Sequence, residues 1–254
     1  MRYAVCGMRY YFLFSQWNHT GVGAIIEAFY PGELGGRAIV DALTGAYNPG
    51  GKVPYTTYIE DFSQQRDIRN TDLASGSGLT YQYYTGPTLW PFGWGLSYTE
   101  FTYTWASGGH TAVTVKNTGA VAGDAVVLAF VHDPNLPKAT GLSALRAPLK
   151  RLAGFERVIG LQPGEERSVE IGIDDESVSF VHETTGQRVL VTGSTWALSV
   201  GDVVAPCVRQ LTVAPRKQGK HGQSHVYVST GEAGEAGEAG DLIVLEDNSW
   251  AAGL

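Results

Sequence analysis

The strongest constraint on the fold is a run of short segments with alternating hydrophobicity between residues 101 and 204. In TAVTVKN, Val113 and Val115 would share one strand face, and Thr114 and Lys116 the other. The segments RSVEIGI and TWALSVG alternate in the same way, and AVVLAFVH, LAGFERVI and QRVLV lie between them. A period of two is typical of strands that bury one face. Six or seven such strands separated by turns predict an all-β immunoglobulin-like sandwich over 101–204.

Residues 22–100 have a different pattern, which predicts strand–helix–strand order. The run VGAIIEAFY fits a strand that is buried on both faces. In ELGGRAIVDALTG the apolar residues recur at helical spacing, and Gly45 stands where a helix would end. KVPYTTY is then expected to form an edge or irregular strand, because Pro54 cannot donate a ladder hydrogen bond. This order is one unit of a layered α/β domain.

Three further segments have no clear periodicity. Residues 60–88 are polar and glycine-rich, which predicts a long surface loop. In WPFGWGLSYTEF (residues 90–101), proline and glycines disfavour both helix and strand interiors, so we expect an irregular crossing segment that joins two packed units. Residues 205–254 include GEAGEAGEAG and are predicted to form a flexible, acidic, glycine-rich tail.

Charge and hydropathy exclude several classes of protein. The net charge is −7 and the 18 Lys and Arg residues are scattered, so we expect no nucleic-acid partner. No apolar run approaches the roughly 18 residues of a membrane span. The apolar core Tyr10–Phe14 is also shorter than the signal-peptide core of about 7–15 residues. The sequence therefore predicts neither a membrane segment nor a signal peptide.

Metal and cofactor motifs are not found in the sequence. It has no GxGxxG, Walker, HExxH or GxSxG motif and no cysteine pair at metal spacing. Cys6 and Cys207 could form a disulfide in a secreted protein, but free thiols are the favoured interpretation. His221 and His225 have i,i+4 spacing, and solvated side chains are favoured over a metal site. We predict no metal-binding and no cofactor-binding residue.

Catalysis by carboxyl groups commonly needs two of them facing each other. Glu33 follows a Pro-Gly turn and is expected in the first turn of the helix, where its charge complements the helix dipole. Asp67 and Arg69 could hold a polar ligand or form a loop ion pair. No acid/base pair stands out, and we predict no catalytic residue in this chain. The triplet Asn18-His19-Thr20 is a glycosylation sequon, relevant only to a secreted protein.

Several of these stretches together resemble a known family. AIIEAFYPGELGGRAIVDALTGAYNPGGKVPYT and TYQYYTGPTLWPFGWGLSYTEF resemble the end of the second catalytic-region domain of glycoside hydrolase family 3, an α/β sandwich. VTVKNTGAVAGDAVVLAFVHDP, PLKRLAGFERVIGLQPGEERSVEI and WALSVGD resemble the fibronectin type III-like domain that follows it. The resemblance covers residues 22–100 and 101–204, and residues 1–21 do not share it.

The resemblance implies a function for a longer protein. Family members begin with a (β/α)₈ barrel that carries the nucleophilic aspartate, and their acid/base glutamate lies upstream of the stretch resembled here, so no residue of this chain inherits either role. The family hydrolyses terminal β-linked xylose or glucose with retention, without a cofactor, and is extracellular. In GLTYQYY, Leu79 and Gln82 replace two arginines of the family pattern, whereas RDIRN is similar to the β-xylosidase-like branch.

A non-enzymatic alternative stays open from the sequence. The β-sandwich could be a module that binds a polysaccharide or a partner protein. Four aromatic residues of the glycine-rich region could stack on sugar rings, although packing in a core or a domain junction is the favoured interpretation. These residues are Tyr81, Tyr83, Tyr84 and Trp90.

Overall fold

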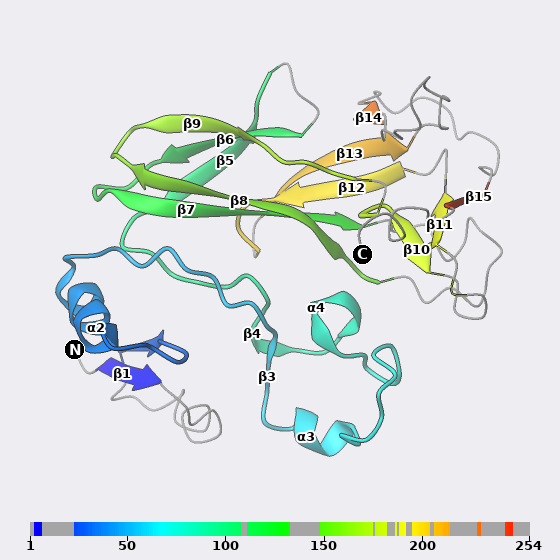
Figure 1. Cartoon of the computed structure of the whole chain (residues 1–254), viewed down its shortest axis with the longest axis horizontal. Helices are drawn as coiled ribbons and strands as arrows, with labels where there is room; N and C mark the ends of the chain where they lie inside the picture. Colours follow the sequence, from blue (N-terminus) through cyan, green and yellow to red (C-terminus); the bar gives the residue numbers. More distant parts are fainter. Residues whose placement is uncertain are drawn as a thin grey trace, which may run out of the picture.

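The computed structural model describes residues 3–6, 23–107, 111–132, 148–174, 176–181, 186, 188–191, 195–203, 206–213, 228–229 and 242–245. Most of them form two parts, which we call the α/β part (residues 3–6 and 23–100) and the sandwich (the two packed sheets that follow). The sandwich occupies one side of the molecule, and the α/β part lies along the outside of one of its sheets (Figure 1).

The sandwich has a three-stranded and a five-stranded sheet, both antiparallel, as the alternating pattern predicts. The first sheet has the order β5-β6-β9, with β5 Phe101–Trp105, β6 Ala112–Asn117 and β9 Glu166–Glu170. The second has the order β14-β13-β12-β7-β8, with β7 Gly123–His132, β8 Arg151–Leu161, β12 Thr195–Val200, β13 Cys207–Val213 and β14 Val228–Ser229.

The hydrophobic core lies between these two sheets. The predicted inward residues Val113 and Val115 are both fully buried, and so are Leu198 and Val200 on the opposite sheet, each at most 1% exposed. Burying a side chain of this size contributes about 1.5–3 kcal/mol. The rest of the core cluster comes from the five-stranded sheet and from the β9–β10 connection, and comprises Ala125, Val127, Ala129, Val131, Val158, Leu161, Ile171, Val178, Trp196 and Leu211.

The predicted tail boundary at residue 205 was wrong. Residues 207–213 form β13, which pairs with β12 along six residues from Cys207↔Val200 to Thr212↔Thr195. Leu211 is 1% exposed and belongs to the core. The sandwich therefore includes a strand that the sequence prediction had assigned to the flexible tail.

A smaller sheet stands beside the sandwich. It has the order β10-β11-β15, with β10 Ser179–Val181, β11 Arg188–Val191 and β15 Leu242–Leu245, all antiparallel. The segment RVLV (Arg188–Val191) is thus a strand, as predicted for QRVLV, but it pairs outside the two main sheets. The acidic repeat GEAGEAGEAG lies outside the described residues.

The α/β part begins with a parallel strand pair, β1 Tyr3–Cys6 and β2 Ala24–Glu27. Helix α2, Gly35–Thr44, follows and ends at Gly45, whose φ of 79° is left-handed and whose N–H donates to the Ala42 carbonyl. This confirms the predicted helix and its glycine stop. The prediction that β2 is buried on both faces was wrong, because its residues are only half-buried and β1 is its one strand neighbour among the described residues.

The third predicted strand is present but does not extend the first sheet. β3, Thr57–Tyr58, pairs with β4, Thr88–Trp90, in a separate two-stranded sheet. Between them the expected long loop contains two short helices, α3 Phe62–Gln65 and α4 Thr80–Tyr83. Aromatic contacts hold this region together, because Phe62 of α3 stacks on Tyr58 of β3 with ring centroids 3.9 Å apart, and Tyr84, the C-cap of α4, meets both rings edge-on.

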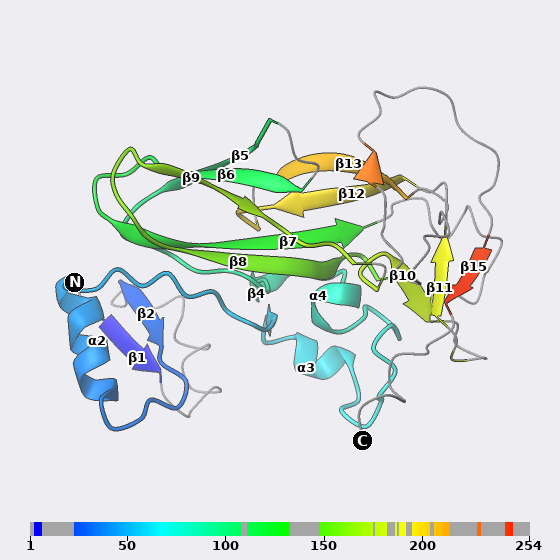
Figure 2. The ribbon, with the colours of Figure 1, turned by 45° about the horizontal axis from the view of Figure 1, so that its top comes forward.

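The segment from β4 to β5 is the irregular crossing that the sequence predicts (Figure 2). Its Gly93 has a φ of 84°, and a Cβ there would lie 2.6 Å from Leu128 Cδ1 and 2.8 Å from Val203 Cγ1. The glycine therefore lets the backbone approach the outer face of the five-stranded sheet. The Gly93 N–H also donates to the Val53 carbonyl over 2.7 Å, which ties the crossing to the α/β part. None of the helices among the described residues has the length and hydrophobicity of a membrane span.

Candidate functional site

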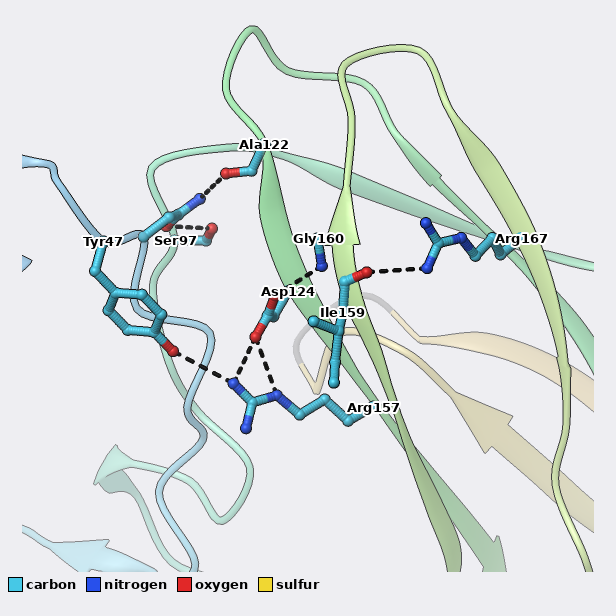
Figure 3. Close-up of polar contacts among 9 residues, drawn as sticks. Tyr47, Ser97, Ala122, Asp124, Arg157, Ile159, Gly160 and Arg167 are labelled. Carbon is cyan, nitrogen blue, oxygen red and sulfur yellow. Dashed lines mark hydrogen bonds and ion pairs between the residues drawn. The ribbon is translucent and has the colours of Figure 1, made fainter.

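The junction between the two parts is organised around Asp124 at the start of β7 (Figure 3). Arg157 of β8 donates from Nε to Asp124 Oδ2 over 3.1 Å, and the Gly160 N–H donates to Oδ1 over 2.8 Å. The Arg157 Nη2 also donates to the Tyr47 hydroxyl of the α/β part over 3.3 Å. One carboxylate thus fixes the β7–β8 pair and an arginine that bridges both parts.

Asn48 joins the same two parts by a second set of hydrogen bonds. Its Nδ2 donates to the Ala122 carbonyl of the sandwich over 3.1 Å. Its Oδ1 accepts from the Ser97 hydroxyl over 3.0 Å and from the Tyr98 N–H over 2.8 Å, both in the crossing segment. The Tyr98 hydroxyl then donates to the Ala42 carbonyl of α2 over 2.6 Å. Asn48 therefore holds the helix, the crossing and the sandwich in one arrangement.

Aromatic packing completes the junction further along β7. The centroid of the Tyr81 ring lies 4.4 Å from that of the Phe92 ring and 5.8 Å from that of the Phe130 ring. The Tyr81 hydroxyl accepts the Leu152 N–H over 3.2 Å, and Lys150 Nζ sits 4.6 Å from the Phe130 ring centroid. Phe130 is 4% exposed. This cluster removes apolar surface of both parts from water and so couples them energetically.

The four aromatic residues considered for sugar stacking lie in or near this packed region. Tyr81 belongs to the junction cluster, and Tyr84 is 7% exposed with its hydroxyl donating to the Pro87 carbonyl over 3.2 Å. Tyr83, which belongs to α4, and Trp90, which belongs to β4, are both half-buried. The positions of Tyr81 and Tyr84 fit the core-or-junction interpretation, since Tyr81 packs on Phe92 and Phe130 and Tyr84 is buried.

A compact loop, residues 66–79, connects α3 to α4, and we call it the Arg66 loop. The Arg66 guanidinium donates to the carbonyls of Ser75 and Asn70, each over 3.0 Å, and to that of Asp72. Asp67 and Arg69 form an exposed ion pair, with Nη2 2.7 Å from Oδ2. Hydrogen bonds from Arg69 lower the pKa of Asp67. The two charged residues thus pair with each other, as one of the sequence interpretations has it.

Glu33 is not in the first turn of the helix, which corrects the sequence prediction. Helix α2 begins at Gly35 with Leu34 as its N-cap, and its first turn holds no acidic residue. The reason is a turn before the helix, in which the Gly35 N–H donates to the Gly32 carbonyl over 2.9 Å.

Three of the described carboxyl groups, Asp67, Asp124 and Glu165, have lowered pKa values, which favours their ionised form. Partial burial raises the pKa of Asp124, but the Gly160 N–H and the Arg157 side chain outweigh this effect, so the net shift is downward. Glu165 accepts the Gln162 N–H and two bonds from Arg167, which lower its pKa. A general acid needs the opposite shift.

Within the described residues there is no group of three or more potential metal ligands. His221 and His225 lie outside the described residues. Cys207 is a free thiol of intermediate exposure in β13, which agrees with the favoured interpretation of that cysteine. The sequence reading missed the junction residues Asn48, Asp124 and Arg157, because a single polar residue in a turn or strand gives no signal of its partner.

The chain has a two-domain architecture, in which an α/β part is followed by a β-sandwich and the two share a junction. Comparison with known proteins shows which family has this architecture. The glycosyl hydrolase family 3 C-terminal domain matches residues 5–98, and the fibronectin type III-like domain matches residues 125–203. The first match begins inside residues 1–21, which the sequence reading had set apart from the family. The chain belongs to glycoside hydrolase family 3, as its C-terminal α/β and fibronectin type III-like region.

Curated relatives and solved structures agree with this assignment. The chain is 34% identical over 203 residues to the probable exo-1,4-beta-xylosidase bxlB of Aspergillus oryzae, covering 69% of this chain and 24% of that protein. It is 32% identical over 228 residues to Beta-D-xylosidase 1 of Arabidopsis thaliana, covering 73% of this chain and 28% of that protein. The chain therefore spans about a quarter of the length of these relatives.

Two solved structures share its fold. A family 3 exo-beta-xylosidase (XlnD) in complex with a xylobiose aziridine activity-based probe matches with a TM-score of 0.66 and 26% identity, covering 86% of this chain and 30% of that one. The Beta-D-glucoside glucohydrolase from Trichoderma reesei matches with a TM-score of 0.61 and 26% identity, covering 76% of this chain and 30% of that one.

Proposed function

We propose that this chain is the non-catalytic C-terminal region of a β-glycosidase that releases terminal β-linked xylose or glucose. Curated relatives named as xylosidases support the substrate class, and xylose is the first sugar to test. In this proposal the preceding region of the enzyme supplies the nucleophile and the acid/base residue. The chain contributes the end of the α/β domain and fastens it to the sandwich.

The observation that carries this proposal is the state of the carboxyl groups. A retaining glycosidase needs a nucleophilic carboxylate and a general acid about 5–5.5 Å apart, the latter with a raised pKa. Asp124 has a lowered pKa and is committed to Arg157 and Gly160 in the junction. Asp67 is committed to Arg69 and also has a lowered pKa. These groups are suited to structure and not to proton donation.

A turnover assay tests the proposal. The purified chain alone should hydrolyse neither 4-nitrophenyl β-D-xyloside nor the matching glucoside above a heat-killed control. The full chain fused behind the portion of the A. oryzae relative that precedes the matched stretch should hydrolyse the xyloside. Saturable turnover by the chain alone, lost on changing one of its carboxylates, would overturn the proposal, and so would an inactive fusion that is folded and monodisperse.

A further inference from the structure

The Arg66 loop presents a fully exposed isoleucine. Ile68 is 97% exposed, more than any other large apolar residue with a described exposure. An isolated apolar residue on a surface is ordinary when its loop is free to move. Ile68 is different, because its loop is held in one conformation by hydrogen bonds.

Hydrogen bonds inside the loop fix the position of its tip. Arg66 donates to three backbone carbonyls across the loop, those of residues 70, 72 and 75. The Asn70 Nδ2 donates to the Ser75 hydroxyl over 3.1 Å, and the Leu79 N–H donates to the Leu73 carbonyl over 2.7 Å. A preorganised loop loses little conformational entropy when a partner covers it.

The charges beside Ile68 neutralise each other. Arg69 Nε donates to Asp67 Oδ1 over 3.0 Å, and its Nη2 donates to Oδ2 over 2.7 Å, a bidentate arrangement. A partner that covered Ile68 would therefore meet a paired carboxylate and guanidinium. Burying a paired charge costs less than burying an isolated one. The tip is thus an apolar residue between two matched charges.

A strained residue stands between the end of the loop and the junction cluster. Thr80 has a φ of 61°, unusual for a β-branched side chain, and its N–H donates to the Tyr58 hydroxyl over 2.6 Å. The next residue, Tyr81, packs in the junction cluster. Backbone strain of this kind persists where the structure needs a particular direction of the chain. Here it sets the loop's direction relative to the sandwich.

The loop region projects on the side away from the sandwich. In Figure 2, α3 and the chain that follows it lie at the bottom of the view, while the sandwich lies above. The matched part of this chain covers only about a quarter of each relative, and the matched domain is the C-terminal one of the family. Polypeptide that precedes this domain in such an enzyme is therefore the partner that we assign to a preorganised loop on the side away from the sandwich.

We propose that the Arg66 loop is an intramolecular docking element, with Ile68 as the apolar anchor that inserts against the preceding region of the enzyme. This inference rests on the proposed function, since it assumes that such a region exists. Asp67 and Arg69 flank the anchor as a neutral pair, and Arg66 and Thr80 keep the loop in its docking conformation.

Hydroxyl-radical footprinting tests the docking without any substitution. The oxidation rate of Ile68 is measured by mass spectrometry in the full chain alone and in the full chain fused behind the preceding region of the A. oryzae relative. We expect at least about a 10-fold lower rate at Ile68 in the fusion. Val208, which is 54% exposed on the sandwich strand β13, is the internal control and should oxidise equally in both. Equal rates at Ile68 would overturn the inference.

A set of variants then separates docking from the proposed function. Ile68→Asp should lower xyloside turnover by the fusion at least about 10-fold, whereas Ile68→Leu should retain it and Val208→Asp should resemble the parent fusion. The melting temperature of the chain alone should be unchanged by Ile68→Asp. An active fusion with unprotected Ile68 would reject docking and leave the proposed function intact. An inactive fusion with protected Ile68 would support docking and reject the proposed function.

Discussion

Arg157 and Asp124 form an ion pair that belongs to two interfaces at once. The Arg157 Nε donates to Asp124 Oδ2 over 3.1 Å across the β7–β8 pair, and the Nη2 of the same arginine reaches the Tyr47 hydroxyl of the α/β part. The side chain of Asp124 is only 12% exposed. The carboxylate is therefore sheltered from solvent, whereas Arg157 is 53% exposed, and the pair couples the fold of the sandwich to the position of the α/β part.

Asp124→Ala should destabilise the chain by about 1–3 kcal/mol, because the Gly160 N–H and Arg157 lose a charged acceptor. The measurement is urea unfolding followed by tryptophan fluorescence. Asp67→Ala is the matched control, since its ion pair with Arg69 is exposed and should contribute nothing measurable. Equal losses in the two variants would contradict the role assigned to Asp124.

The stability contributed by Asp124 should depend on pH. Its pKa in the folded chain is lowered, so its contribution is fully present above the unfolded-state pKa of about 3.9 and is lost as the pH falls through the folded value. The melting temperatures of the parent chain and Asp124→Asn should therefore converge as the pH is lowered from 6 to 2.5. A gap of constant size over that range would show that the lowered pKa has no part in stability.

Gly201→Ala should destabilise the sandwich more than Gly164→Ala. Both glycines have positive φ, 91° and 79°, and placing alanine there costs about 1–2 kcal/mol. A Cβ at Gly201 would also lie 2.6 Å from the Tyr103 ring, whereas nothing lies within 4 Å at Gly164. The clash should add about 1–3 kcal/mol. Chemical denaturation of the two variants measures the difference, and equal losses would argue against close packing of Tyr103 on Gly201.

Leu211→Ala should cost about 2–5 kcal/mol, because it opens a cavity in the core of the sandwich. Val208→Ala on the same strand should cost much less, since Val208 is 54% exposed. Thermal melts of the two variants test whether β13 belongs to the sandwich. A harmless Leu211→Ala would restore the original prediction that residues beyond 205 are a dispensable tail.

The sandwich could be predicted from sequence because three of its strands, β6, β9 and β12, show their alternation locally. β13 could not, and Arg209 explains why. The core-facing positions of CVRQLTV are Cys207, Arg209 and Leu211, so a charged residue interrupts the apolar pattern. In the structure the Arg209 guanidinium lies 4.5 Å from the Trp105 ring, where a cation–π contact stabilises it. Such a contact depends on a ring more than a hundred residues away and leaves no mark on the local pattern.

The junction was predicted in its position but not in its contacts. Glycines and aromatics between residues 90 and 101 indicate a crossing segment, since both signals lie within one short stretch. The hydrogen bond from Asn48 to the Ala122 carbonyl joins residues 74 positions apart, and the Asp124–Arg157 pair depends on the register of β7 and β8. Register and domain placement are properties of the folded chain. A sequence motif does not specify them.

The most direct test of the central claim is whether this chain can form a covalent glycosyl-enzyme intermediate. Retaining glycosidases form this intermediate through a carboxylate nucleophile. The purified chain is incubated with a xylose-configured aziridine probe, and its intact mass is measured, with the fusion to the preceding region of the A. oryzae relative as the positive control. We predict one added probe on the fusion and no added mass on the chain alone. A single probe on one carboxylate of the isolated chain, blocked by prior addition of xylobiose, would show that the chain contains its own nucleophile and would contradict the claim.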